Sequence, residues 1–384
     1  MAIDKQANAA VEDAIARAIE QRSEIGIQVA AYLGGELVID ASGGVADPQT
    51  GRLVDGDTLF NVFSVTKGVV ATALHLQAER GLVEYDRPVC EYWPEYGANG
   101  KQAVTVRDAL SHRTGTPQMP EGVTVETIGN WDTMAAGCAQ QAPMFPVGSP
   151  AYQSFSFGWV IGEIVRRTDP HERSFRDFVQ QEICDPFNIP DLWIGVDPQV
   201  EPRIARLTNA DAGHPVPETG STLERSMPNA IRLIPEVYEQ SAMRQACVPG
   251  TGGIFTARSC ARFWAILANG GELDEKRLLS RDRIDMACER RPGAMEPDPV
   301  FFGAIMPLSQ GGYWLCDGAM PNTCPVKSPR AICSPGVGGS LGWADPETGL
   351  AVAFCHNDMS NPQDCDAQPA SDIANTIRSS LGLG

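Results

Sequence analysis

The chain has 384 residues, is 43% hydrophobic, and carries a formal net charge of -18 at pH 7 with a pI near 4.7. This size and apolar content suffice to bury a large core, in one big domain or two interleaved ones. The acidic balance argues against nucleic acid or an anionic membrane surface as the main partner, because both attract basic stripes. A small neutral or cationic molecule fits better, and no membrane span is expected because no apolar run is long enough.

The first 23 residues predict an amphipathic helix, because apolar residues recur at helical spacing between charged ones. They lack the basic and apolar blocks of a signal peptide, so we expect a cytoplasmic protein whose eleven cysteines are mostly reduced. Cys316, Cys324 and Cys333 lie close in sequence, but no C-x-x-C pair and no nearby histidine accompanies them. Neither a metal nor a disulfide is expected there, and no cofactor is implied.

The predicted elements place strands at both ends of the chain and helices in the middle. Gly34-Gly35 separates two β-prone runs, 25–33 and 36–42, which predicts a hairpin. Further strands are expected over 58–63, 301–308, 312–317, 339–344 and 350–357, and helices over 64–80, 106–112, 155–167, 175–184, 256–269 and 372–381. Residues 195–247 are irregular and polar, which suggests a long surface excursion covering a cleft.

This order predicts an α/β (α+β) fold with a central antiparallel sheet completed by both ends of the chain. The expected α/β domain comprises residues 1–66 and 248–384. A mainly helical insertion domain would occupy 67–247, and the active site would lie at the interface between the two.

The predicted helix over 64–80 begins with a serine and a lysine three residues apart. Ser64 and Lys67 would share one helix face. A serine hydroxyl is a poor nucleophile near neutral pH, but an amine whose pKa is lowered by burial can take its proton. The positive end of the helix dipole would also disfavour the charged amine. From these residues alone, an N-capping serine beside a solvated lysine is an equally good interpretation.

Two other side chains are candidates for proton transfer. Tyr152 follows a proline- and glycine-rich loop, 143–150, and precedes a predicted helix, so it can point into a cleft. The alternative is a core aromatic with a satisfied hydroxyl. His112 is a possible general base, but a histidine at a helix end more often satisfies the last carbonyls.

A rival nucleophile lies in Gly338-Gly339-Ser340-Leu341-Gly342, which fits the G-x-S-x-G pattern. That pattern needs a strand-to-helix turn and a downstream acid and histidine. Another strand is predicted after Ser340, and His356 is the only later histidine. Ser340 is therefore the weaker candidate. The glycine-rich segment 249–253 lacks a following Gly-Lys-Ser/Thr, so it predicts close backbone contact and not a phosphate site.

Several segments occur in the order seen in serine β-lactamase-like hydrolases. They are Thr58-Leu59-Phe60, Ser64-Val65-Thr66-Lys67, Asp86-Arg87-Pro88-Val89, Tyr92-Trp93-Pro94, Asp108-Ala109-Leu110-Ser111-His112-Arg113-Thr114-Gly115, the 146–158 segment with Tyr152, and Gly336-Val337-Gly338-Gly339-Ser340. The chain resembles class C β-lactamases and family VIII carboxylesterases over roughly residues 20–360. The resemblance implies a β-lactamase/DD-peptidase-like fold, with a sheet flanked by helices and a mainly helical domain.

The resemblance also implies roles for individual residues. Ser64 would be the acylated nucleophile and Lys67 its proton partner. Tyr152 would be a general base or acid shared with Lys67, provided that the cation lowers the pKa of the phenol. The backbone N–H groups of Ser64 and Val337 would form the oxyanion hole. The substrate would be lined by Ser154, Ser334, Gly336 and Gly338, and no metal would be needed.

Two departures from the family pattern concern the substrate. β-Lactamases carry Tyr-x-Asn and Lys-Thr-Gly, where this chain has Tyr152-Gln153-Ser154 and Ser334-Pro335-Gly336. The missing lysine would help to hold a substrate carboxylate, so the changes favour a neutral ester. We therefore expect a serine hydrolase that cleaves small carboxylic esters through an acyl-enzyme on Ser64. The alternatives are an acyltransferase with the same acyl-enzyme, an amidase, β-lactamase or D-peptidase, and a non-catalytic binding module.

Overall fold

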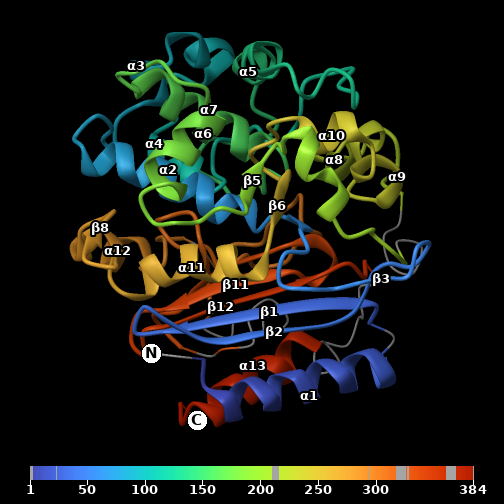
Figure 1. Ribbon diagram of the computed structural model, residues 1–384. Coiled ribbons are helices and arrows are strands. Elements are labelled where there is room, and N and C mark those ends of the chain that lie inside the picture. The colour runs from blue at the N-terminus through green and yellow to red at the C-terminus, as the bar shows by residue number, and fades with distance from the viewer. Residues whose placement is uncertain are drawn as a thin grey trace.

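A computed structural model describes residues 3–22, 24–209, 216–293, 295–316, 326, 328–359 and 369–383. A seven-stranded sheet crosses the lower half of the molecule (Figure 1). Its order is β3-β2-β1-β12-β11-β10-β9, so strands from the two ends of the chain lie side by side. The strands are β1 (Gly26–Leu33), β2 (Glu36–Asp47), β3 (Arg52–Leu53), β9 (Trp314–Leu315), β10 (Ile332–Pro335), β11 (Leu341–Asp345) and β12 (Leu350–His356).

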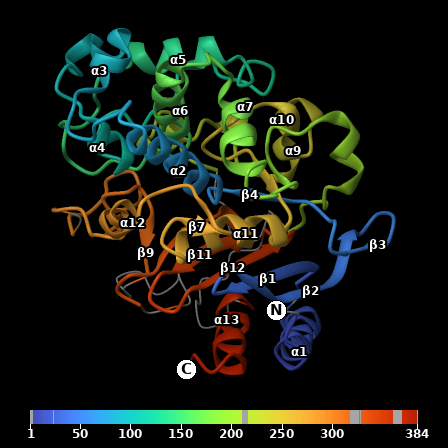
Figure 2. The same cartoon turned by 60° about the vertical axis from the view of Figure 1, so that its left-hand side comes forward.

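Strands β1 and β12 form the centre of the sheet. They pair antiparallel from Ile27 opposite His356 to Leu33 opposite Leu350, and nearly every residue in both is buried. Helices α1 (Lys5–Arg22) and α13 (Pro369–Ser380) cover one face of the sheet, and α11 (Ala257–Ala268) covers the other (Figure 2). Both faces of β1 and β12 are therefore dry, which explains their almost continuous apolar sequence.

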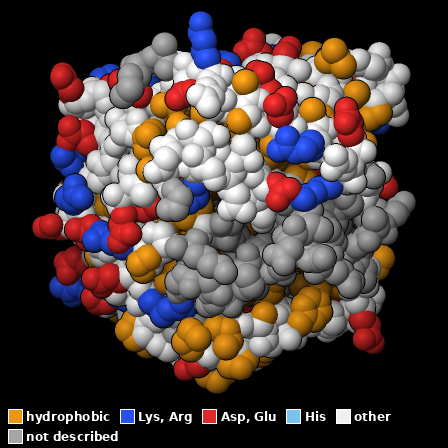
Figure 3. Space-filling view, turned by 90° about the horizontal axis from the view of Figure 1, so that it is seen from below, with side chains coloured by type: hydrophobic (Ala, Val, Ile, Leu, Met, Phe, Trp, Pro, Cys, Tyr) orange, Lys and Arg blue, Asp and Glu red, His pale blue; other side chains and the backbone are white. Residues whose placement is uncertain are grey.

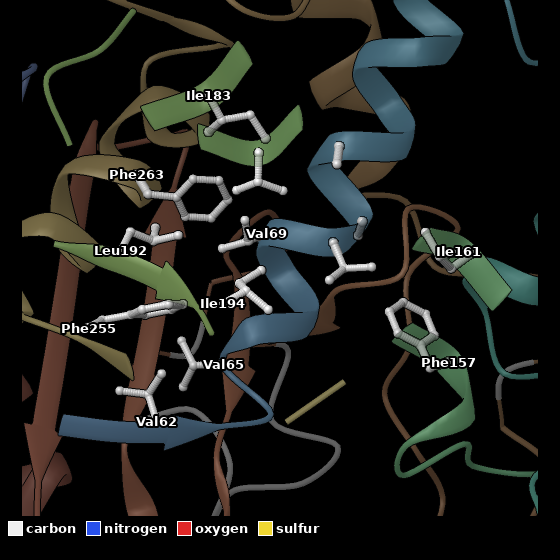
Figure 4. Close-up of a cluster of buried hydrophobic side chains, with 14 of the residues drawn as sticks. Val62, Val65, Val69, Phe157, Ile161, Ile183, Leu192, Ile194, Phe255 and Phe263 are labelled. Atoms are coloured by element: carbon white, nitrogen blue, oxygen red, sulfur yellow. The ribbon is translucent and has the colours of Figure 1, made fainter. Parts of the chain in front are cut away.

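Helix α2 (Thr66–Glu79) runs through the middle of the helical half, with 13 of its 14 residues buried. Figure 4 shows it between two walls of apolar side chains, with Leu192, Ile194 and Phe255 on one side and Phe157 and Ile161 on the other. Helix α2 is thus buried on every side and belongs to the core. The residues at its N-terminus therefore stand on a rigid support.

The other elements of this half are mostly short. A small sheet has the order β4-β6-β5, formed by β4 (Phe60–Phe63), β6 (Gly253–Phe255) and β5 (Leu192–Ile194). The helices are α3 (Val89–Tyr92), η1 (Pro94–Gly100), α4 (Val106–Leu110), α5 (Trp131–Gln140), α6 (Ser156–Thr168), α7 (Phe175–Val179) and η2 (Gln180–Cys184). The expected irregular excursion contains η3 (Pro198–Arg203), α8 (Thr222–Ser226), η5 (Asn229–Ile231), α9 (Pro235–Tyr238) and α10 (Ser241–Gln245). Next to α11 lie β7 (Glu272–Leu273), β8 (Lys276–Arg277) and α12 (Arg281–Ala287).

The structure confirms the predicted hairpin at Gly34-Gly35, corrects two other expectations and adds one strand that was not predicted. The helix predicted from residue 64 begins at Thr66, and β10 was not predicted. The strand predicted over 301–308 is largely a turn, because Asp298 Oδ1 accepts the N–H groups of Val300 and Phe301. Local side-chain bonds of this kind compete with extended structure.

The cysteines differ partly from expectation. Cys316 is disulfide-bonded, so the prediction that this region carries no disulfide is wrong, whereas the other eight described cysteines are thiols. Cys324 lies outside the described residues. Sequence spacing did not reveal the bond because a disulfide requires only that two Cα atoms approach within about 7 Å in the fold.

The described surface carries charges of both signs. On the face in Figure 3, acidic and basic side chains are interspersed. Among the described helices, none has the length and apolar character needed to cross a bilayer. The described residues also include no group of three or more His, Cys, Asp or Glu side chains arranged to hold a metal ion.

Candidate active site

Ser64 lies in a tight turn between β4 and α2. The preceding residue, Phe63, has a φ of 47°, a left-handed conformation that is costly for a bulky side chain. The Thr66 hydroxyl donates a hydrogen bond to the Phe63 carbonyl and accepts one of 2.8 Å from the Gly253 N–H. On the other side, the Ser334 hydroxyl donates to the Ser64 carbonyl at 2.7 Å. The turn is therefore held by both sheets, through β6 and β10.

Lys67 lies one helical turn after Ser64 and is only 3% exposed. Its Nζ is 2.9 Å from Ser64 Oγ and donates to the carbonyls of Ser154 and Gly250, each at 2.8 Å. Burial lowers the pKa of Lys67 to about 7. A neutral amine has two N–H donors and one lone pair. The two carbonyls use the donors, which leaves the lone pair to accept the hydrogen of the Ser64 hydroxyl.

Tyr152 is the third member of the cluster. Lys67 Nζ lies 5.6 Å from the centre of its ring. Burial raises the pKa of Tyr152 above its usual value, and the charge of the nearby Asp298 carboxylate raises it further. A hydrogen bond with the Ser64 side chain lowers this pKa, but by less than burial raises it. The expectation that a cation lowers this pKa is wrong for the described structure. Tyr152 is therefore a neutral phenol near pH 7.

His112 supports the segment that carries Tyr152. It follows α4 with a φ of 56°, and its Nδ1 accepts the Gln153 N–H at 3.0 Å. Its ring lies 4.5 Å from that of Tyr152. Burial, together with the charge of Lys67, holds the pKa of His112 well below its usual value. His112 is therefore neutral near pH 7, and among the described residues its side chain accepts the Gln153 N–H and bonds to no helix carbonyl, unlike the interpretation from the sequence.

The 195–247 excursion contributes one residue that the sequence did not single out. Ser226, at the end of α8, is fully buried, and its Oγ lies 3.1 Å from Ser154 Oγ and 3.3 Å from the Tyr152 carbonyl. It also accepts the Ser154 N–H at 3.3 Å. No motif or spacing marks Ser226, because its partners come from a distant segment. The excursion therefore closes one side of the cluster.

Two backbone N–H groups are available beside the Ser64 hydroxyl. Neither Ser64 N–H nor Val337 N–H donates to an acceptor in the part of the chain that the structure describes. Val337 begins η6 (Val337–Gly339), which Gly336 connects to the end of β10. A Cβ on Gly336 would lie 2.3 Å from the Val62 carbonyl, so only glycine lets this edge approach the chain before Ser64. Two unpaired donors here can receive an oxyanion.

Four residues were expected to line the substrate, and each has identifiable protein contacts. The Ser154 hydroxyl bonds to the Ser226 hydroxyl. The Ser334 hydroxyl donates to the Ser64 carbonyl. Gly336 lies against Val62, and Gly338, with a φ of 88°, faces the backbone of Asp358 and Met359. Direct contact of these four residues with substrate stays a prediction.

Replacing Ser334 by alanine should loosen the nucleophile turn. The Ser64 carbonyl would keep the hydrogen bond from the Lys67 backbone N–H but lose the one from Ser334, which costs about 0.5–1.5 kcal/mol of stability. We expect a lower melting temperature together with a fall in kcat/KM of up to about tenfold. Ser328→Ala is the control, because Ser328 is also buried but bonds to Asp345 and not to Ser64. Equal losses of activity in the two variants would contradict a specific role for Ser334.

Comparison with known proteins decides the family. The Beta-lactamase family model matches residues 11–375, almost the whole chain. The chain belongs to the beta-lactamase family. Among curated relatives of this beta-lactamase-family protein is the esterase/beta-lactamase LipL of Mycobacterium tuberculosis (strain ATCC 25618 / H37Rv). The two are 33% identical over 349 residues, which is 87% of this chain and 77% of LipL.

Solved structures agree with this assignment. A family VIII carboxylesterase superposes with a TM-score of 0.86 and 29% identity, covering 98% of this chain and 99% of that one. A penicillin-binding protein homologue from Caulobacter crescentus gives a TM-score of 0.85 at 29% identity, with the same coverage. The expected α/β class and the family resemblance are thus confirmed. The beta-lactamase-family protein has the fold of a serine hydrolase, and its relatives include esterases.

Proposed function

We propose that the protein is a carboxylesterase that hydrolyses small neutral esters through an acyl-enzyme on Ser64. The observation that carries the proposal is the placement of Lys67 Nζ, 2.9 Å from Ser64 Oγ, with both of its other neighbours being carbonyls. This arrangement suits a neutral amine that accepts the serine proton.

In the acylation step, Ser64 Oγ attacks the ester carbonyl as its proton passes to Lys67 Nζ. The carbonyl oxygen becomes an oxyanion that the N–H groups of Ser64 and Val337 receive. When the tetrahedral intermediate collapses, the C–O bond to the alcohol breaks. The leaving oxygen takes a proton from the phenol of Tyr152, which Lys67 then restores.

Deacylation repeats these steps with water in place of the alcohol. Lys67 takes a proton from the water molecule, and the water oxygen attacks the acyl carbon. The Ser64 oxygen leaves and recovers a proton through Tyr152 and Lys67. Each proton and electron pair is returned by the end of the cycle, so no metal or redox group enters the balance.

The polar groups around Ser64 favour a neutral substrate. Ser334 stands where the family motif has a lysine, and its hydroxyl is already committed to the Ser64 carbonyl. Ser154 is likewise paired with Ser226. Neither of these two serines offers a charge to a substrate carboxylate, so desolvating that carboxylate beside them would be costly. β-Lactams and D-peptides are therefore poorer candidates than uncharged esters.

A substrate panel tests this proposal. The purified protein would be assayed with p-nitrophenyl esters of increasing acyl length, a chromogenic cephalosporin and p-nitroanilides. We expect the largest kcat/KM for a short ester and a value at least about 100-fold lower for the lactam, equivalent to about 2.7 kcal/mol. A greater kcat/KM for the lactam or the anilide would overturn the assignment.

Tyr152→Phe tests the proton-relay role of the phenol. The ring packing against His112 would be retained, while the hydroxyl would be lost. We expect kcat to fall about 100-fold or more, because general acid–base groups typically contribute 10²–10⁴-fold. Ser64 should still be labelled by a fluorophosphonate whose fluoride leaves without protonation. A Tyr152→Phe enzyme with the wild-type kcat would exclude the relay.

An acyltransferase with the same acyl-enzyme is the second candidate. The observation that favours it is the contact of Ser226, from the long excursion, with Ser154 and the Tyr152 carbonyl. An excursion that reaches the cluster can shape a site for an alcohol or amine acceptor. Product analysis with added alcohols would decide, because transfer requires that the ester product rise at the expense of free acid.

Cytoplasmic location remains a prediction from the N-terminal sequence. The disulfide at Cys316 is more usual in an oxidising compartment. Cell fractionation followed by detection of the native protein would distinguish a cytoplasmic location from an oxidising compartment.

A further inference from the structure

A buried ion pair lies beneath the turn that carries Val337. Glu24 precedes β1 and His356 ends β12, and the pairing of these strands brings the two residues together. His356 Nδ1 lies 3.0 Å from Glu24 Oε2, and the two side chains are only 4% and 6% exposed. A carboxylate buried this deeply is costly unless a cation pairs with it.

The opposite edge of the His356 ring faces the glycine turn. A Cβ on Gly339 would lie 3.1 Å from Nε2, so the absence of a side chain lets the turn rest on the ring. Nε2 is buried and makes no hydrogen bond of ordinary geometry to a described residue. The His356 backbone N–H donates to Ser340 Oγ at 3.3 Å. His356 thus contacts the turn at Gly339 and again at Ser340.

These contacts give the G-x-S-x-G motif a role other than nucleophilic attack. Ser340 is 2% exposed and accepts a backbone N–H, so its hydroxyl anchors the turn to β12. Gly339 leaves room for the imidazole. Val337, at the start of the same turn, carries one of the two N–H groups assigned to the oxyanion.

We propose that the Glu24–His356 pair is a positioning element for the oxyanion hole, which holds the 337–339 turn and thereby the Val337 N–H in place. The inference rests on the proposed function, because it needs an oxyanion for Val337 to receive. An oxyanion donor has to be fixed within a few tenths of an ångström to stabilise the transition state. A charged pair locked beneath a glycine turn supplies such a support.

The groups around His356 predict how this support responds to pH. Burial lowers the pKa of His356, but the charge and hydrogen bond of Glu24 outweigh it, and the Asp358 charge and the Gly338 backbone act in the same direction. The pKa is therefore raised above the ordinary 6.5. The ring is protonated below that raised value and loses its charge as pH rises through it. The Val337 N–H should therefore be held less firmly, and kcat should decline, as pH rises above the pKa of His356.

The test compares pH profiles of kcat and KM for the wild type and Glu24→Gln. Glutamine keeps the size and a hydrogen-bond acceptor but removes the charge that raises the pKa of His356, so this pKa should fall. We expect the alkaline limb of kcat to move to lower pH, with KM and the acid limb unchanged. Glu163→Gln is the matched control, because Glu163 is another buried carboxylate, bonded to Trp131, Arg166 and Arg167.

A purely structural pair would lower the melting temperature and leave the alkaline limb in place. That result in Glu24→Gln would overturn the inference, as would an equal shift of the limb in Glu163→Gln. His356→Gln provides a second variant, in which kcat should be reduced and the alkaline limb absent, because glutamine does not titrate. If the wild-type protein hydrolyses no ester in the panel, the proposed function is wrong, and this inference is wrong with it.

Discussion

Ser64→Ala should remove at least about 10⁴-fold of the esterase kcat, the scale of loss seen when a hydrolase nucleophile is deleted. The residual rate would come from the oxyanion donors and substrate binding, which the substitution leaves intact. No acyl or phosphonyl adduct should be detected by intact mass after incubation with an ester or a fluorophosphonate. The fold should survive, because the bond from Ser334 goes to the backbone carbonyl of residue 64.

Ser340→Ala is the informative comparison for this experiment. The Ser340 hydroxyl accepts the His356 N–H and is buried, so its loss weakens the turn but should still allow an adduct to form on Ser64. The predicted pattern is no adduct in Ser64→Ala and an adduct in Ser340→Ala. An adduct in Ser64→Ala and none in Ser340→Ala would show that Ser340, and not Ser64, is the nucleophile.

Lys67→Arg should lower kcat/KM by about 10²–10⁴-fold, the range attributed to a general base. Arginine keeps the positive charge and donors, but its guanidinium cannot act as a base because its pKa exceeds 12. In the wild type, activity should rise as pH increases through about 7, since burial lowers the pKa of Lys67 to that value and the neutral amine is the active form. Below this pH the amine is protonated and the rate falls.

Lys101 provides the control for Lys67. It is also fully buried, its Nζ donates to backbone carbonyls including that of Ala139, and burial lowers its pKa to about 8. Lys101→Met removes a buried lysine that makes no contact with Ser64, so the acid limb of the pH profile should stay near 7. Movement of that limb in Lys101→Met, or its persistence in Lys67→Arg, would show that Lys67 is not the group that titrates.

The sequence predicted the elements whose signals are local. Gly34-Gly35 between two β-prone runs marked the hairpin, and the amphipathic, largely apolar run over 64–80 marked the helix that supports the site. The pairing of Ser64 with Lys67 was also predictable, because a spacing of three residues brings side chains together at the start of a helix. These features need no knowledge of the rest of the chain.

Features that depend on distant contacts were missed. The protonation state of Tyr152 depends on its burial, which no motif encodes, and Ser226 acquires its role only when the excursion folds onto the Tyr152 segment. The strand predicted over 301–308 failed because Asp298 bonds locally to the backbone and bends the chain there. The His356 ring was weighed only as a partner for Ser340, and its position beneath the turn emerges from the pairing of β1 with β12.

Activation of Ser64 requires above all that the amine of Lys67 is neutral at the pH of catalysis. The chain has only five lysines, so selective ¹³C labelling at lysine Cε followed by an NMR pH titration can resolve each one, with Lys67→Arg assigning the signal. We predict that the Lys67 signal titrates near pH 7. A signal that is lost in Lys67→Arg but titrates near 10, as in an unperturbed lysine, would contradict the proposed activation of Ser64.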